Sequence, residues 1–252
     1  MRRFLLALGA LLMFGSVARA ADPDALWKIV SEKCVPDERD HGQPAPCAAV
    51  DLGDGAHGGY VVLKDLVGDT QYLLMPTAKI TGIEDPQVLA PDALNYFADA
   101  WRARHFTVTA AKRELPRDDL SLAINSVYGR TQNQLHIHID CITPAVREAV
   151  AKHIAELGDS WAPFPEQLAG HDYRALRLGE DGLDRVNAFQ RIAEGIPGAR
   201  AVMGKQTLAV VGAVLPGGVP GFVLLEDEGN LATGDPGSGE ELQDHSCAVA
   251  HE

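Results

Sequence analysis

The stretch 133-NQLHIHID-140 decides the fold of this chain, because it places two histidines two residues apart between long aliphatic side chains. Alternate residues of a strand face the same way. The alternation predicts a polar face of Gln134, His136, His138 and Asp140 and an aliphatic face of Leu135, Ile137, Ile139 and Cys141. We expect the aliphatic face to pack against helices. The polar face should open to a cleft or to solvent, because an apolar core would leave four adjacent polar groups unsatisfied.

Strand-like runs on both sides of this stretch predict an antiparallel sheet. Residues 120–125 (LSLAIN) should pair with it through a short connection that contains Gly129. Two further pairs of runs predict hairpins, an earlier one of residues 59–66 and 71–77 and a later one of residues 206–215 and 221–228. The later hairpin resembles the earlier one in pattern, which leaves open a second lobe of similar design.

Helical patterns lie between the strand-like runs. Residues 91–106 carry apolar side chains at helical spacing, and Thr143 with Pro144 forms an N-cap and first-turn signal for another helix. Shorter helices are expected at 22–33, at 183–195 and after Ser238, where a capping-box spacing to Glu241 predicts a last helix that carries Cys247. No Pro-, Gly- or Ser-rich linker divides residues 21–252, so we predict one α+β domain.

Composition limits the classes of partner. The chain has 252 residues, of which 46% are hydrophobic and 23% are charged, so it can bury a sizeable core. Its formal net charge is −13. A chain of this charge repels phosphates and anionic lipids, which argues against nucleic acid as a partner and against electrostatic attraction to an acidic membrane.

Residues 1–20 predict a targeting segment. Arg2 and Arg3 precede an apolar run that is short for a bilayer span, and Ala18 and Ala20 form a small-x-small cleavage pattern. We expect a signal peptide or an N-terminal membrane anchor. The two arginines should stay on the cytoplasmic side. This places the body at the periplasmic face of the inner membrane, or in the periplasm if the segment is cleaved.

The four cysteines fit an oxidising compartment. Cys34 and Cys47 bracket the Pro-rich residues 35–46, which have no apolar periodicity and are expected to form a loop. Four cysteines allow three connectivities. We favour Cys34 with Cys47 and Cys141 with Cys247.

The polar face of the histidine strand has three interpretations. It is a solvent-facing surface, or half of a metal site for which no motif supplies a third ligand, or a nucleophilic imidazole with a second imidazole beside it. In the last case both histidines would act on one phosphoryl group. No metal and no cofactor are predicted.

The residues GRTQNQLHIHI (129–139) resemble the signature of the histidine triad nucleotide hydrolases and transferases. In that signature a glycine and a serine or threonine precede three alternating histidines. Gly129 and Thr131 match, His136 stands at the nucleophile position and His138 at the third histidine. Gln134 replaces the first histidine, so the role of that position differs here.

A wider set of motifs resembles the bacterial CDP-diacylglycerol pyrophosphatases over nearly all of the body. These motifs are YVVLKDL, QYLLMPT, SLAINS, GRTQNQLHIHIDC, GHDYRALR and QDHSC. The resemblance implies a histidine triad-like antiparallel sheet with helices. It also implies hydrolysis of CDP-diacylglycerol to CMP and phosphatidate at a membrane lipid surface.

The resemblance implies roles for seven residues. His136 would attack the phosphorus attached to cytidine, and His138 would donate a hydrogen bond to a phosphate oxygen. The expected substrate-binding residues are Asn125, Arg130, Thr131, Gln134 and Lys79. Lys79 and Arg130 are the expected cations for the leaving phosphate, and Asn125 is expected to contact the ribose or phosphate of the nucleotide. Gln134 would hydrogen-bond the bridging or leaving oxygen, because phosphatidate can leave without a proton from a general acid.

Two other functions stay open at this point. One is hydrolysis of soluble nucleoside diphosphate conjugates, and the other is binding of nucleotide or lipid without turnover, which Gln134 suggests. The Gly-rich residues around His57 are expected to be a flexible loop and not a phosphate cradle. His171 and His245 are not predicted to take part in catalysis.

Overall fold

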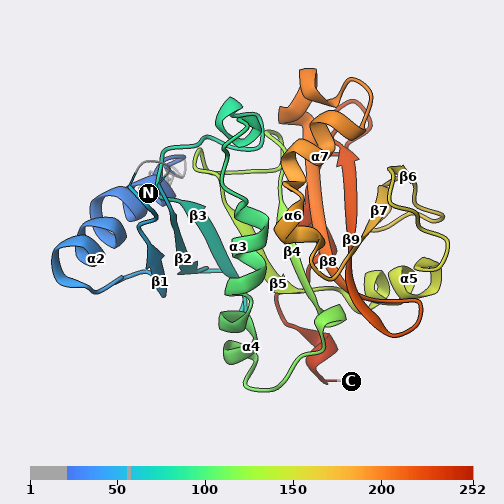
Figure 1. Cartoon of the computed structure of the whole chain (residues 1–252), viewed down its shortest axis with the longest axis horizontal. Helices are drawn as coiled ribbons and strands as arrows, with labels where there is room; N and C mark the ends of the chain where they lie inside the picture. The colour runs from blue at the N-terminus through green and yellow to red at the C-terminus, as the bar shows by residue number, and fades with distance from the viewer. Residues whose placement is uncertain (1–21, 56–57, 252) are drawn as a thin grey trace, which may run out of the picture.

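The computed structural model describes residues 22–55 and 58–251. The predicted segment 1–20 and residues 56–57 of the Gly-rich loop, which include His57, fall outside these ranges. Within them nine strands form one antiparallel sheet in the order β1-β2-β3-β5-β4-β8-β9-β7-β6 (Figure 1). The strands are β1 Ala49–Asp51, β2 Tyr60–Lys64, β3 Tyr72–Pro76, β4 Leu120–Ile124, β5 Ile137–Cys141, β6 Ala162–Pro163, β7 Arg174–Gly179, β8 Gln206–Leu215 and β9 Val219–Glu228.

The α-helices are α1 Ala25–Ile29, α2 Val35–His41, α3 Tyr96–Ala103, α4 His105–Ala111, α5 Pro144–His153, α6 Gly182–Arg185 and α7 Ala188–Gly195. Helices α3, α6 and α7 lie over one face of the sheet (Figure 1). None of the helices in the described part of the chain is long and apolar enough to cross a bilayer.

The strand pairings follow the predicted hairpins. Strand β2 pairs with β3, β4 with β5, and β8 with β9, all antiparallel. Because β8 also pairs with β4, the later hairpin extends the same sheet and does not form a second lobe. The α+β prediction is confirmed, and the alternative of a separate lobe is wrong.

The alternation along β5 divides it as predicted. Ile137 and Ile139 are fully buried in the main core, together with Phe97 of α3 and Phe189 of α7. His138 and Asp140 therefore belong to the opposite face of the sheet. This second face has one apolar cluster around Val61, Leu73 and Met75 and another beneath α5, and the histidine strand lies between them.

The helix predictions hold best where a cap is present. The Thr143 side chain accepts a hydrogen bond from the Val146 amide and starts α5. The helix predicted over 91–106 begins later, at Tyr96, because Asn95 caps it. The helix predicted over 183–195 is split at Asn187, whose side chain caps α7.

Two local predictions are wrong. The segment between Cys34 and Cys47 is not irregular but contains α2, whose first turn tolerates Pro36 and whose end is set by Gly42 at a φ of 65°. No capped helix follows Ser238. Its hydroxyl donates to Asn125 Oδ1 at 3.1 Å, and residues Gly239–Leu242 form only a 3₁₀ turn.

Both predicted disulfides are present. Cys34 is bonded to Cys47, and Cys141 to Cys247. The second bond spans 106 residues and ties the C-terminal segment to the end of β5. That segment thereby lies against the polar face of the histidine strand.

Candidate active site

A cavity of about 650 Å³ opens beside the histidine strand. His136, His138, Asn125, Arg130 and Thr131, all predicted from the sequence, line it. The lining also includes six apolar side chains, Leu26, Ile29, Leu63, Leu66, Val67 and Leu73. The cavity thus places two imidazoles beside a surface suited to hydrocarbon.

His136 is held in one tautomer by the main chain. Its Nδ1 lies 2.7 Å from the carbonyl oxygen of Gln134, so Nδ1 carries the hydrogen and donates it. Nε2 keeps its lone pair. Burial lowers the pKa of His136, and this favours the neutral ring at pH 7. A neutral imidazole with a fixed free nitrogen is the form required of a nucleophile.

His138 lies beside His136, with the two ring centroids 4.9 Å apart. Gln71 Nε2 donates to His138 Nδ1 and, at 3.1 Å, to Glu240 Oε1. This arrangement leaves the hydrogen on His138 Nε2, a buried atom without a hydrogen-bond partner among the described residues. Burial and the neighbouring His136 lower the pKa of His138. An unpaired N–H donor next to the nucleophile suits an incoming phosphate oxygen.

Glu240 connects the two sides of this site. Its carboxylate accepts from Asn125 Nδ2 at 3.0 Å and lies 3.3 Å from His245 Nε2. Burial raises the pKa of Glu240, but the hydrogen bonds from His245, Asn125 and Gln71 outweigh it and hold the pKa below its usual range. Asn125, expected to touch the nucleotide, is committed to Glu240.

His245 supplies a positive charge behind the histidine pair. Its Nδ1 lies 2.8 Å from Asp140 Oδ2 on β5. The contacts with Asp140 and Glu240 raise the pKa of His245 to about 10, so its ring is an imidazolium at neutral pH. Asp140 is fully buried and also accepts from Thr70 Oγ1 at 2.6 Å.

The polar face of the strand is therefore only partly open. His136 and His138 line the cavity, but their side chains are only 7% and 5% exposed. Gln134 and Asp140 are fully buried. Gln134 Nε2 and the Asp140 carboxylate have protein partners, whereas Gln134 Oε1 has none among the described residues. The expectation of a cleft is confirmed for the two histidines and is wrong for Gln134 and Asp140, because loops and the C-terminal segment cover these two residues.

Gln134 does not reach the predicted position. Its Nε2 donates to the carbonyl oxygens of Pro76 and Ala78, each at 3.0 Å, and the residue does not line the cavity. The side chain joins the end of β3 to the start of the histidine strand. The structure gives no support to a contact between this amide and the leaving oxygen.

The predicted cations differ in availability. Arg130 lines the cavity, but its guanidinium makes two hydrogen bonds to the Glu84 carboxylate, at 2.6 and 2.5 Å. Lys79 lies outside the cavity lining and pairs with Asp24 at 3.4 Å. Lys64, which the sequence analysis did not select, lines the cavity and donates to the carbonyl oxygens of Asp65 and Gly68.

Sequence reasoning missed Lys64, Gln71, Glu240 and His245. Gln71 and Lys64 lie in the two motifs of the first hairpin, and His245 lies in QDHSC. These motifs carried the resemblance, but no spacing rule connects them to residues 136 and 138. The favoured pairing of Cys141 with Cys247 was the available signal, because it brings residues near 245 to the end of β5.

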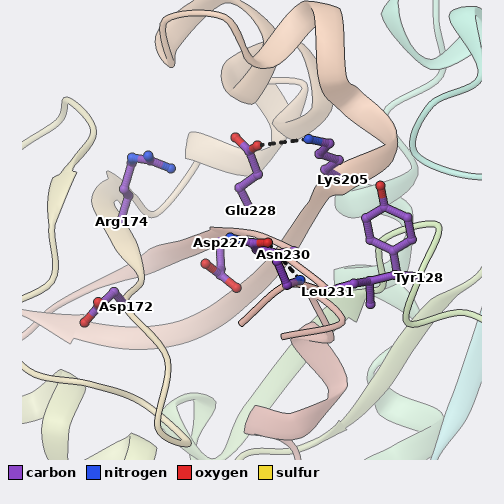
Figure 2. Close-up of a pocket in the computed structure, with 10 residues that line it drawn as sticks. Tyr128, Asp172, Arg174, Lys205, Asp227, Glu228, Asn230 and Leu231 are labelled. Atoms are coloured by element: carbon purple, nitrogen blue, oxygen red, sulfur yellow. Dashed lines mark hydrogen bonds and ion pairs between the residues drawn. The ribbon is translucent and has the colours of Figure 1, made fainter. Parts of the chain in front are cut away.

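A second hollow, of about 540 Å³, lies between the β7, β8 and β9 ends and the residues after β9 (Figure 2). Lys205 and Glu228 pair across it at 3.8 Å. Neither His136 nor His138 lines it. Two of its charged side chains, Asp172 and Arg174, belong to the GHDYRALR motif of the resemblance.

One group in the described part of the chain has the donor set and spacing for a metal ion. Ligand atoms of His171, Asp227 and Asp235 lie within 4.8 Å of one another. His171 Nδ1 is already 2.7 Å from Glu241 Oε1, so the histidine also holds the C-terminal segment. The group does not include either histidine of the cavity.

Comparison with known proteins identifies the class and then the family. The family model described as CDP-diacylglycerol pyrophosphatase matches residues 21–251. A CDP-diacylglycerol pyrophosphatase from Yersinia pestis is 44% identical over 252 residues, which cover 98% of this chain and 95% of the relative. The chain is thus a hydrolase, and it belongs to the CDP-diacylglycerol pyrophosphatase family. The family predicted from the motifs is confirmed.

Proposed function

We propose that this enzyme hydrolyses CDP-diacylglycerol to CMP and phosphatidate through a covalent cytidylyl intermediate on His136. The observation that carries the mechanism is the 2.7 Å hydrogen bond from His136 Nδ1 to the Gln134 carbonyl oxygen, which keeps a lone pair on Nε2. Membership of the family supports the substrate.

In the first step His136 Nε2 attacks the phosphorus attached to cytidine. A phosphorus–nitrogen bond forms, the anhydride bond breaks, and its electron pair stays on the phosphatidate oxygen. Phosphatidate leaves without a proton, since the second pKa of a phosphomonoester is about 6. Water then attacks the same phosphorus, the phosphorus–nitrogen bond breaks, and CMP is released.

His138 stabilises the charge that grows on the phosphate oxygens. Its Nε2 hydrogen has no protein acceptor, and a non-bridging oxygen would supply one. Gln71 holds the ring, Glu240 holds Gln71, and Asn125 and His245 hold Glu240. Donors that are fixed before the reaction are typically worth about 3 kcal/mol each in the transition state.

Lys64 is the cation we assign to the leaving phosphate in place of Lys79. Lys64 lines the cavity, and its ammonium donates hydrogen bonds to two backbone carbonyl oxygens. Among the described residues it has no carboxylate partner. Thr131 is exposed at the rim and can donate to a phosphate oxygen. Arg130 is retained as a wall residue that Glu84 holds in place.

We further propose that the enzyme works at the periplasmic face of the inner membrane, or in the periplasm if residues 1–20 are removed. The lipid substrate and the predicted targeting segment support this location. The apolar side chains of the cavity lining favour a lipid over soluble nucleotide conjugates.

The test is to trap the intermediate from substrate labelled at the cytidylyl phosphate. After rapid quenching in base, the label should map to the peptide that contains His136. His136→Ala should carry no label and should lose at least about a thousandfold in kcat/KM. His105→Ala, at an exposed histidine outside the cavity, is the matched control and should label normally. Label on another residue with His136→Ala still active would contradict the proposal.

A further inference from the structure

The loop between β2 and β3 carries the most exposed large apolar side chain of the described chain. Leu66 is 101% exposed, and its neighbour Val67 is 53% exposed. Single exposed apolar residues are common on protein surfaces and need no explanation. These two differ in that both also line the catalytic cavity.

Several hydrogen bonds and a close packing contact hold this loop. Lys64 Nζ donates to the carbonyl oxygens of Asp65 and Gly68 at 2.9 Å each, and the Val67 amide donates to Asp65 Oδ1 at 3.2 Å. Gly68 has a φ of 66° and packs so closely on His245 that a Cβ there would lie 2.6 Å from the Cβ of His245. A tip held in this way presents Leu66 and Val67 in a fixed position.

The base of the same loop belongs to the catalytic network. Gln71 contacts His138 and Glu240, and Thr70 donates to Asp140. The distance along the chain from Leu66 to Gln71 is only five residues. One short loop therefore joins the histidine pair to two apolar side chains that point to solvent.

The cavity lining combines apolar and polar side chains. Leu26 and Ile29 of α1 and Leu63 of β2 line the cavity with Leu66 and Val67, and the two histidines line the same cavity. CDP-diacylglycerol combines the same two kinds of group, with a charged diphosphate at one end and two acyl chains at the other. The histidines fit the diphosphate, and the apolar side chains fit the start of the acyl chains.

The net charge of the chain indicates which force would hold this loop on a lipid surface. The chain has a formal net charge of −13, which argues against long-range attraction to an anionic lipid surface as the driving force. Apolar contact does not depend on this charge. Burial of a leucine side chain is worth about 1.5–3 kcal/mol, which corresponds to roughly tenfold to a hundredfold in an equilibrium constant.

We infer that Leu66 and Val67 insert among the acyl chains of the lipid surface and bring the diphosphate of CDP-diacylglycerol to His136. This inference rests on the proposed function and adds the surface through which the lipid enters. Lys64, at the base of the loop, would then meet the phosphate nearest the glycerol.

The test compares one enzyme on two substrates. Full-length chain is assayed on long-chain CDP-diacylglycerol in phosphatidylcholine vesicles and on CDP-glycerol, which has the same diphosphate and no acyl chains. For Leu66→Asp/Val67→Asp the ratio of the two kcat/KM values, vesicle over soluble, should fall at least about tenfold. The conservative variant Leu66→Met should keep most of the wild-type ratio. Raising the salt concentration should not lower the wild-type ratio.

Leu231→Asp is the matched control, because Leu231 is 61% exposed and lines the second hollow and not the catalytic cavity. Its ratio should equal that of the wild type. An unchanged ratio in the double variant, or an equal fall in Leu231→Asp, would overturn the inference. If the wild type released no CMP from either substrate, the proposed function itself would fail, and this result is distinct from a changed ratio.

A second measurement tests the inference even if the double variant does not fold. Leu66→Trp is mixed with vesicles whose acyl chains carry bromine, a quencher of indole fluorescence. The expected result is stronger quenching than for wild type, whose tryptophans are Trp27, Trp101 and Trp161. Leu231→Trp should show no added quenching. Equal quenching of both variants would contradict insertion by the loop.

Discussion

His136 Nδ1 lies 2.7 Å from the main-chain carbonyl oxygen of Gln134, two residues earlier in the chain. The acceptor belongs to the backbone, so the tautomer of the nucleophile does not depend on which side chain occupies position 134. A glutamine can therefore stand where the histidine triad signature has its first histidine, and His136 keeps its orientation.

The first prediction concerns the pH dependence of activity. Burial lowers the pKa of His136 below its usual value of about 6.5, so the ring stays neutral as pH falls through that value. The acid limb of kcat/KM on CDP-diacylglycerol should therefore lie below pH 6.5. The same profile is measured for His245→Gln, to identify any contribution from His245. An acid limb of kcat/KM centred above pH 6.5 in both proteins would contradict the assignment of a neutral nucleophile.

The second prediction concerns Gln134. Gln134→Ala removes two buried hydrogen bonds and leaves a small cavity, which should cost about 2–3 kcal/mol in the free energy of unfolding. Because its amide does not line the cavity, kcat/KM should fall by no more than about tenfold. Gln134→His should stay within about tenfold of wild type.

Denaturant unfolding and steady-state assays of the same preparations check this prediction. Gln134→Met, which keeps the volume without the amide, controls for the cavity. If Gln134→Ala were fully stable and as inactive as His136→Ala, the side chain would have to act on the substrate.

The third prediction concerns His245 and stability. Its folded pKa, about 10, exceeds the value of about 6.5 expected in the unfolded chain. The stabilisation is therefore fully present below pH 6.5 and is lost as pH rises toward 10. After allowance for solvent screening of the partly exposed ring, we expect a loss of about 1–2 kcal/mol in the free energy of unfolding.

The measurement is urea unfolding at pH 6 and pH 9.5 with the disulfides intact. His245→Gln should show a smaller difference between the two pH values than wild type, and His41→Gln, at an exposed histidine of α2, serves as the control. Identical pH dependence in wild type and His245→Gln would show that the ring is not held as an imidazolium.

The fourth prediction concerns chelators. The proposed reaction uses an imidazole nucleophile, and the described metal-like group of His171, Asp227 and Asp235 does not include it. Dialysis against EDTA should leave kcat within about twofold of the untreated enzyme. Loss of activity that zinc restores would replace the nucleophile with a metal-activated water.

Local sequence signals predicted most of the sheet. Alternation placed Ile137 and Ile139 against α3 and placed the two histidines on the opposite face. Cap signals located α5 at Thr143. These features depend on neighbours within a few residues, which a single sequence displays.

The rest of the site depends on contacts between distant segments. Glu240 and Asn125 meet across 115 residues, and His245 and Asp140 across 105. The periodicity of a single sequence does not predict contacts between such distant residues. Lys79 and Gln134 were assigned by position in a motif, and their actual partners, Asp24 and the carbonyl oxygens of Pro76 and Ala78, were set by how the first helix and hairpin pack.

The central claim is that cytidylyl transfer passes through a covalent bond to His136, and the stereochemical course at the cytidylyl phosphorus tests it most directly. The substrate is CDP-diacylglycerol made chiral by sulfur at that phosphorus, hydrolysed in water enriched in ¹⁸O. Two displacements, by His136 and then by water, predict overall retention of configuration in the thio-CMP product. Inversion would mean a single direct attack by water and would contradict the account.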